Sequence, residues 1–102
     1  MIHVVAVITA KAGQRAALLE IFAANRAAVL AEAGCIEYAA TVDAAGLPAS
    51  KGSFGADTFV VIEKWESLPA LQAHAVAPHM AAYGAKTKEM TESRVIHVLE
   101  PV

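Results

Sequence analysis

The chain has 102 residues, of which 57% are hydrophobic and 18% charged, and a formal net charge of −2. This length predicts one domain over residues 1–102, and the dispersed charges leave no basic patch for nucleic acid or an anionic membrane. No apolar run approaches the roughly 18 residues of a membrane span. The single cysteine, Cys35, excludes an intrachain disulfide and fits a reducing, cytoplasmic setting.

The first predicted element is a strand over residues 2–9, whose β-branched residues argue against a targeting signal. Because this strand is apolar on both faces, we expect both faces to be covered. A helix is predicted over about residues 14–33, with Gly34 as the residue that ends it. Its apolar stripe holds Leu18, Phe22 and Val29. Glu32 is expected mainly on the opposite, polar side.

Two further strands are predicted over residues 35–43 and 57–65, joined by a long loop over 44–56 that contains three glycines and a proline. Such loops are often functional, although a floppy hairpin is the commoner case. Strand side chains alternate with period two, so one face of the third strand carries both apolar and acidic residues. These are Phe59, Val61, Glu63 and Trp65.

A broken helix is predicted after the third strand. Ser67 is placed as its N-cap, and Pro78 biases Ala77 away from helical geometry, so we expect a break there and a restart near His79. The last strand is predicted over residues 93–100.

This order, β-α-β-β-α-β, predicts an α+β, ferredoxin-like domain with a four-stranded antiparallel sheet and helices on one face. The bare face is also apolar. Two sheets packed face to face in a homodimer, as a dimeric α+β barrel, would bury it.

Three side chains are the candidate catalytic residues. His74 or His79 suits a general base or hydrogen-bond donor, because imidazole titrates near neutrality; a solvated histidine at a helix end is the plain alternative. Their spacing of five, across a proline and without a cysteine cluster, argues against a metal. Glu63, among apolar neighbours, should pair with another group or have a raised pKa; the alternative is an edge salt bridge.

Some cofactor-binding and catalytic motifs are absent, and the large aromatic residues allow two interpretations. The sequence has no glycine-rich phosphate loop and no G-x-S-x-G motif, so flavin and nicotinamide cofactors have no support. Each large aromatic residue fits either the core or a ligand wall. These residues are Trp65, Tyr38, Phe22 and Tyr83. Composition and spacing therefore predict a small dimeric α+β domain with a polar-rimmed apolar pocket.

The run V-V-I-E-K-W-E-S-L-P-A-L-Q-A-H-A-V-A-P-H-M-A-A-Y closely resembles the antibiotic biosynthesis monooxygenase family. With G-C-I-E-Y upstream, the resemblance is nearest to its quinol monooxygenase branch. It implies a dimeric ferredoxin-like fold and oxygenation with no metal, flavin or other cofactor. The phenolic substrate, once deprotonated, would itself pass an electron to O2, and the two radicals would recombine.

The resemblance also implies roles for individual residues. His74 or His79 would be the base and Glu63 its orienter, and we rank His74 first because it shares a helical face with Leu71. The substrate wall would comprise Trp65, Tyr38, Phe22, Tyr83, Phe59 and Met80. Val61 stands where polyketide-tailoring members carry Asn, which favours a smaller quinol. No Asn lies on the first strand, which argues against haem cleavage.

Two other functions remain open. The fold also hosts an isomerase of a phosphorylated signalling dione, which has a similar E-x-[aromatic]…H…P-H stretch. A phosphorylated substrate would need a basic pocket, whereas the basic residues here are scattered. The third hypothesis is a dimer that binds a small ligand without turnover.

Overall fold

The computed structural model describes residues 1–48 and 51–102; residues 49–50 of the predicted loop lie outside the described residues. The elements in chain order are β1 (Ile2–Ala10), α1 (Arg15–Leu30), β2 (Cys35–Thr41), β3 (Thr58–Trp65), α2 (Leu68–Ala75), α3 (Pro78–Thr87), a short 3₁₀ helix (Lys88–Met90) and β4 (Thr91–Leu99). The predicted element order is therefore confirmed. The second strand ends two residues earlier than predicted, and the last begins two residues earlier.

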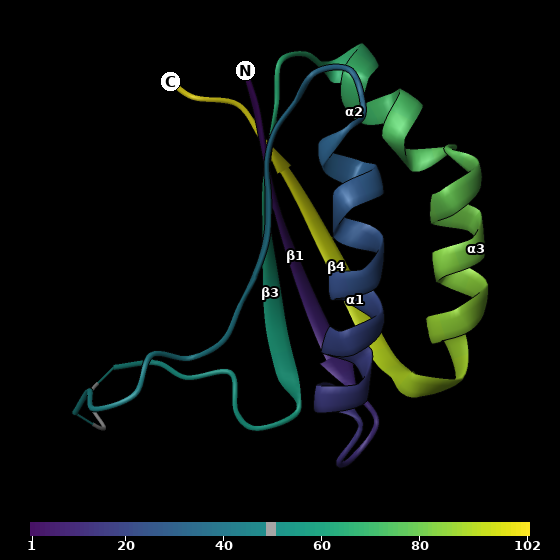
Figure 1. Ribbon diagram of the computed structural model, residues 1–102. Coiled ribbons are helices and arrows are strands. Elements are labelled where there is room, and N and C mark those ends of the chain that lie inside the picture. The colour runs from purple at the N-terminus through teal and green to yellow at the C-terminus, as the bar shows by residue number, and fades with distance from the viewer. Residues whose placement is uncertain (49–50) are drawn as a thin grey trace.

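The four strands form one antiparallel sheet in the order β2-β3-β1-β4. The helices lie on one face of this sheet, and the described parts of the β2–β3 connection extend past its end (Figure 1). This arrangement confirms the predicted α+β, ferredoxin-like fold. None of the helices in the described ranges is long and apolar enough to cross a membrane.

The stripe predicted for α1 is buried against the sheet, since Leu18, Phe22 and Val29 are each at most 3% exposed. The helix ends at Leu30, however, not near residue 33. A turn follows in which the Cys35 N–H donates to the Glu32 carbonyl at 3.2 Å. Gly34 has a φ of +83° and lies within this turn, so it is not the residue that directly follows the helix.

The predicted helix break is confirmed. The Ser67 hydroxyl accepts a hydrogen bond from the Ala70 N–H at 3.3 Å, which caps α2. Ala77 is extended, with φ −63° and ψ 140°, and α3 begins at Pro78. Because proline disfavours helical geometry in the preceding residue, α2 and α3 are separate helices. The break places His74 near the end of one helix and His79 in the first turn of the next.

The two faces of the sheet differ in burial. On the helix face, alternate residues of β1 are buried from Ile2 to Ala10. On the open face, Val5 and Val7 are half-buried, and Val95, paired with Val7 across β1 and β4, is 51% exposed. The protein therefore presents an apolar sheet face that its own helices do not cover.

Candidate active site

A cavity of about 350 Å³ lies on the helix face of the sheet, and all of the helices and strands except the short 3₁₀ helix contribute to its wall. Its lining includes six of the predicted site residues: Phe22, Tyr38, Glu63, His74, Met80 and Tyr83. Leu71 and Arg94 also line it, on α2 and β4. A volume near the lower end of the range for ligand sites suits a small molecule.

The structure places three other predicted site residues outside the lining. Trp65 and Phe59 are 0% exposed and lie behind the cavity wall, because β3 is central and its apolar side chains are covered by helices. His79 faces a different surface depression, beside α1. The expectation that Trp65 and Phe59 form the wall itself is therefore corrected: they support the residues that do.

Trp65 supports two of the candidate catalytic residues. Its indole N–H donates to the Glu63 carboxylate at 3.0 Å, and its ring packs against the His74 ring with centroids 4.6 Å apart. The edge of Tyr38 meets His74 from another side, with centroids 5.6 Å apart. The His74 imidazole is thus held between two aromatic rings, and rotation of its side chain is restricted.

Glu63 is only 7% exposed, and burial raises its pKa, as expected from its apolar neighbours. The hydrogen bond from Trp65 and the nearby His74 act in the opposite direction but do not outweigh burial. Burial of Glu63 therefore disfavours ionisation of its carboxyl group.

We expect Glu63→Gln to stabilise the fold at neutral pH. When the pKa of a carboxyl is higher in the folded state than in the unfolded state, the folded protein loses stability as pH rises. The loss begins near the unfolded-state pKa, about 4.3, and is complete above the folded-state pKa. Glutamine cannot ionise, and its amide oxygen still accepts from Trp65. Urea unfolding at several pH values should show the stability of the variant relative to the wild type increasing as pH rises above about 4. A difference that is constant with pH would contradict this account.

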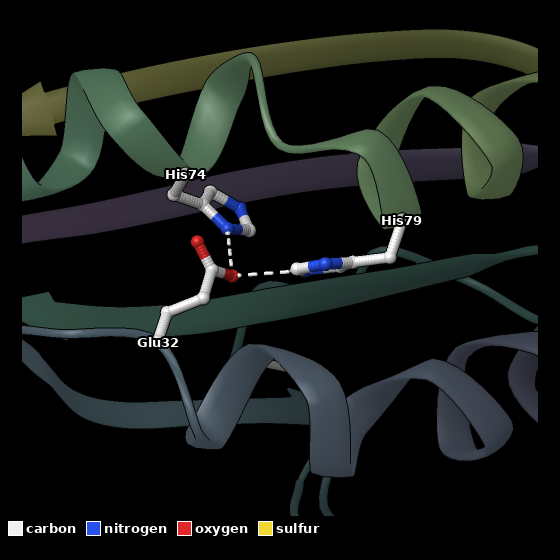
Figure 2. A group of neighbouring side chains, drawn as sticks. All are labelled: Glu32, His74 and His79. Atoms are coloured by element: carbon white, nitrogen blue, oxygen red, sulfur yellow. Dashed lines mark hydrogen bonds and ion pairs between the residues drawn. The ribbon is translucent and has the colours of Figure 1, made fainter.

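The hydrogen-bond partner of His74 is Glu32, not Glu63 as predicted. His74 Nδ1 lies 2.8 Å from Glu32 Oε2, and His79 Nε2 lies 3.0 Å from the same oxygen (Figure 2). Because α1 ends at Leu30, the turn that follows brings Glu32 under α2 and α3, where its side chain is 14% exposed. Glu32 is the functional candidate that sequence reasoning missed.

This pairing fixes the tautomer of His74. A carboxylate only accepts hydrogen bonds, so in the neutral form of His74 Nδ1 carries the proton and Nε2 carries the lone pair. Nε2 has no hydrogen-bond partner among the described residues, yet no buried side-chain atom there is left unpartnered. Nε2 is therefore not fully buried, and the His74 side chain lines the cavity. A base requires this arrangement: an oriented ring with its lone pair open to a ligand.

Three aromatic residues contribute to a wall that is otherwise mostly aliphatic. Phe22 stacks on Tyr38 with centroids 5.0 Å apart and meets Tyr83 edge to face at 6.5 Å. Burial raises the pKa of both tyrosines, although Arg94 partly opposes this at Tyr83. Both phenols are therefore neutral at pH 7 and are able to donate hydrogen bonds to a ligand oxygen.

The sequence matches the antibiotic biosynthesis monooxygenase family model over residues 1–86, a range that includes every candidate catalytic residue. The chain belongs to the antibiotic biosynthesis monooxygenase family. The match ends within α3, so β4 and its cavity residue Arg94 lie beyond it.

Individual relatives align with this family member along nearly its whole length. It is 42% identical over 104 aligned residues to a protein of Escherichia coli named probable quinol monooxygenase YgiN, covering 99% of this chain and 98% of the relative. Among solved structures, PA3566 from Pseudomonas aeruginosa is 26% identical with a TM-score of 0.81, covering 99% of this chain and 93% of that one. Rv0793 from Mycobacterium tuberculosis is also 26% identical, with a TM-score of 0.80, covering 99% and 94%.

For a member of the antibiotic biosynthesis monooxygenase family, this site offers a defined set of chemical functions. The largely apolar wall suits an apolar ligand, the tyrosine hydroxyls can donate hydrogen bonds, and the neutral imidazole of His74 can accept a proton. His74 also forms a group with His79 and Glu32. Among the described residues, the donor atoms of this group lie close enough together to hold a metal ion.

Proposed function

We propose that this protein is a cofactor-independent monooxygenase that oxidises a small quinol, or a related phenolic aromatic, with O2. The observation that supports this most is that Glu32 orients the His74 ring through Nδ1, while the His74 side chain lines an apolar cavity whose wall includes aromatic residues. The family and the name of the E. coli relative are consistent with it.

In the proposed reaction, Nε2 of His74 removes a proton from a quinol hydroxyl, and the resulting phenolate passes one electron to O2. The two radicals then combine at a ring carbon. One oxygen atom enters the ring as a hydroxyquinone and the other leaves as water, so the quinol itself supplies the electrons. The protein raises the phenolate fraction and holds the ring, which requires no redox group of its own.

The cavity favours this substrate class over a phosphorylated one. Arg94 is the only lysine or arginine among the described residues that line the cavity, and Glu63 lines it as well. A phosphate dianion in the cavity would be repelled by this carboxylate and would have a single guanidinium to pair with. A neutral two-oxygen aromatic of quinol size fits both the charge and the volume.

Oxygen uptake with a panel of quinols and anthrones tests this proposal. We expect chelator-treated protein to accelerate O2 consumption with at least one small quinol, and to produce no oxygenated product under anaerobic conditions. Loss of turnover on removal of a stoichiometric metal would contradict the cofactor-free mechanism. Binding of every quinol without O2 consumption would instead support a non-catalytic ligand-binding protein.

We also propose that the protein is a homodimer in which two open sheet faces pack together. The half-buried and exposed valines on that face, Val5, Val7 and Val95, form the apolar surface that needs cover. Light scattering at micromolar concentration should give twice the 10.6 kDa chain mass. A monomeric mass would contradict the packing of two sheets.

A further inference from the structure

We propose that Glu32, His74 and His79 form a binding site for a divalent late transition-metal cation, with Zn²⁺ the best match, and that the bound cation inhibits the enzyme. Binding follows from the geometry alone. Inhibition rests on the proposed function, because it acts through His74 as the base.

The three side chains already converge on one point. Both imidazole nitrogens are hydrogen-bonded to the same carboxylate oxygen, at 2.8 and 3.0 Å, and the three donor atoms lie within 4.8 Å of one another. Two imidazoles and a carboxylate are a common protein ligand set for Zn²⁺, with water as the fourth ligand. The pair of histidines alone did not predict a metal; Glu32, from a distant part of the sequence, supplies the third donor.

The surroundings favour a cation. No lysine or arginine among the described residues pairs with Glu32, and a second carboxylate, Glu63, lies close enough to interact with both Glu32 and His74. The His79 side chain is 28% exposed, so an ion can enter from solvent without crossing the cavity. Trp65 and Tyr38 hold the His74 ring in place, which limits the ordering that binding requires.

A metal ion at this site would act on the reaction through the His74 ring. Coordination by Nδ1 replaces the hydrogen bond to Glu32 and forces the remaining imidazole proton onto Nε2. Nε2 then has no lone pair to accept a proton from the substrate. Neither Glu32 nor His79 lines the cavity, so the ion would sit behind His74 rather than beside the substrate. We therefore expect inhibition, not metal-assisted oxygenation.

Titration calorimetry of ZnCl2 into chelator-treated, dialysed protein tests the binding site. We expect one Zn²⁺ per chain in the wild type, and more than about 100-fold weaker binding in Glu32→Gln and His79→Gln, since even an outer partner of a metal ligand is worth 10–100-fold. The matched control is Glu89→Gln, an exposed carboxylate on the short 3₁₀ helix outside the cluster, which should bind as the wild type does. Absence of binding, or equal binding by all variants, would overturn the site.

Oxygen uptake with added Zn²⁺ tests whether the bound cation inhibits the enzyme. We expect the wild type to lose activity over the same concentration range in which calorimetry shows binding, and to recover it with chelator. Binding without any loss of turnover, or stimulation by Zn²⁺ or Fe²⁺, would overturn the inhibitory role. If no quinol is turned over at all, the proposed function fails while the calorimetric result still decides whether the site exists.

Discussion

Replacing His74 by alanine is expected to lower turnover of a small quinol by about 10²-fold or more, the usual scale for loss of a general base. His74 is the histidine that lines the cavity, and its Nε2 is open to a ligand. His79→Ala should cost less, because His79 contacts Glu32 but not the cavity. Oxygen uptake under saturating quinol provides the comparison.

Two further measurements separate a base from a structural residue. Added imidazole should partly restore turnover in His74→Ala, because the deleted ring leaves room beside the cavity. Glu32→Ala should give a smaller loss and a changed pH–rate profile, since Glu32 acts by orienting the His74 ring. Full quinol oxidation by His74→Ala would remove this residue from the mechanism.

Gly34→Ala is expected to lower the free energy of unfolding by about 2–5 kcal/mol. The left-handed conformation of Gly34, with φ +83°, costs about 1–2 kcal/mol for a residue with a Cβ. That Cβ would also lie 2.7 Å from the Ala70 Cβ, and such overpacking costs about 1–3 kcal/mol. Because the same turn carries Glu32, quinol turnover should fall as well.

Gly13→Ala is the matched control for this prediction. Gly13 has a similar φ of +76°, but no atom of the described residues lies within 4 Å of the position of its added Cβ. Gly13→Ala should therefore lower the free energy of unfolding only by the cost of the left-handed conformation, about 1–2 kcal/mol, and leave turnover unchanged. Urea unfolding measures both variants. Equal losses in the two would show that the approach of α2 to Gly34 has no energetic consequence.

The fold was predictable because its signals are local. The period-two face of β3, the Ser67 cap and the break at Pro78 each follow from neighbouring residues, and the structure confirms them. The apolar stripe of α1 was equally clear. The element boundaries were less certain, since the end of α1 at Leu30 depends on the turn packed against α2.

The candidate site was predictable only in part. His74 and Glu63 were found from their residue types, and the structure places both on the cavity. The predicted pairing of these two residues with each other was wrong. Glu63 accepts a hydrogen bond from Trp65, two residues away on the same strand face, whereas His74 bonds to Glu32, 42 residues away. Glu32 had the pattern of a solvated helix residue. Only the early end of the helix, a tertiary effect, turns it inward.

The wall shows the same limit. Tyr38, Phe22, Tyr83 and Met80 line the cavity as predicted, but Trp65 and Phe59 lie behind it. Their side chains share the cavity-facing side of β3, and periodicity alone does not distinguish a residue that borders a cavity from one covered by a helix. Arg94 gave no sequence signal, since its place on the wall depends on the pairing of β4 with β1.

Incorporation of labelled oxygen distinguishes a cofactor-free monooxygenase from the alternatives. Chelator-treated protein should be incubated with a small quinol under ¹⁸O₂ and the product analysed by mass spectrometry, with His74→Ala as the control. We expect one ¹⁸O atom in the hydroxyquinone made by the wild type, at a rate at least about 10²-fold above that of the variant. A product with no ¹⁸O, or equal labelling rates with and without His74, would contradict this expectation.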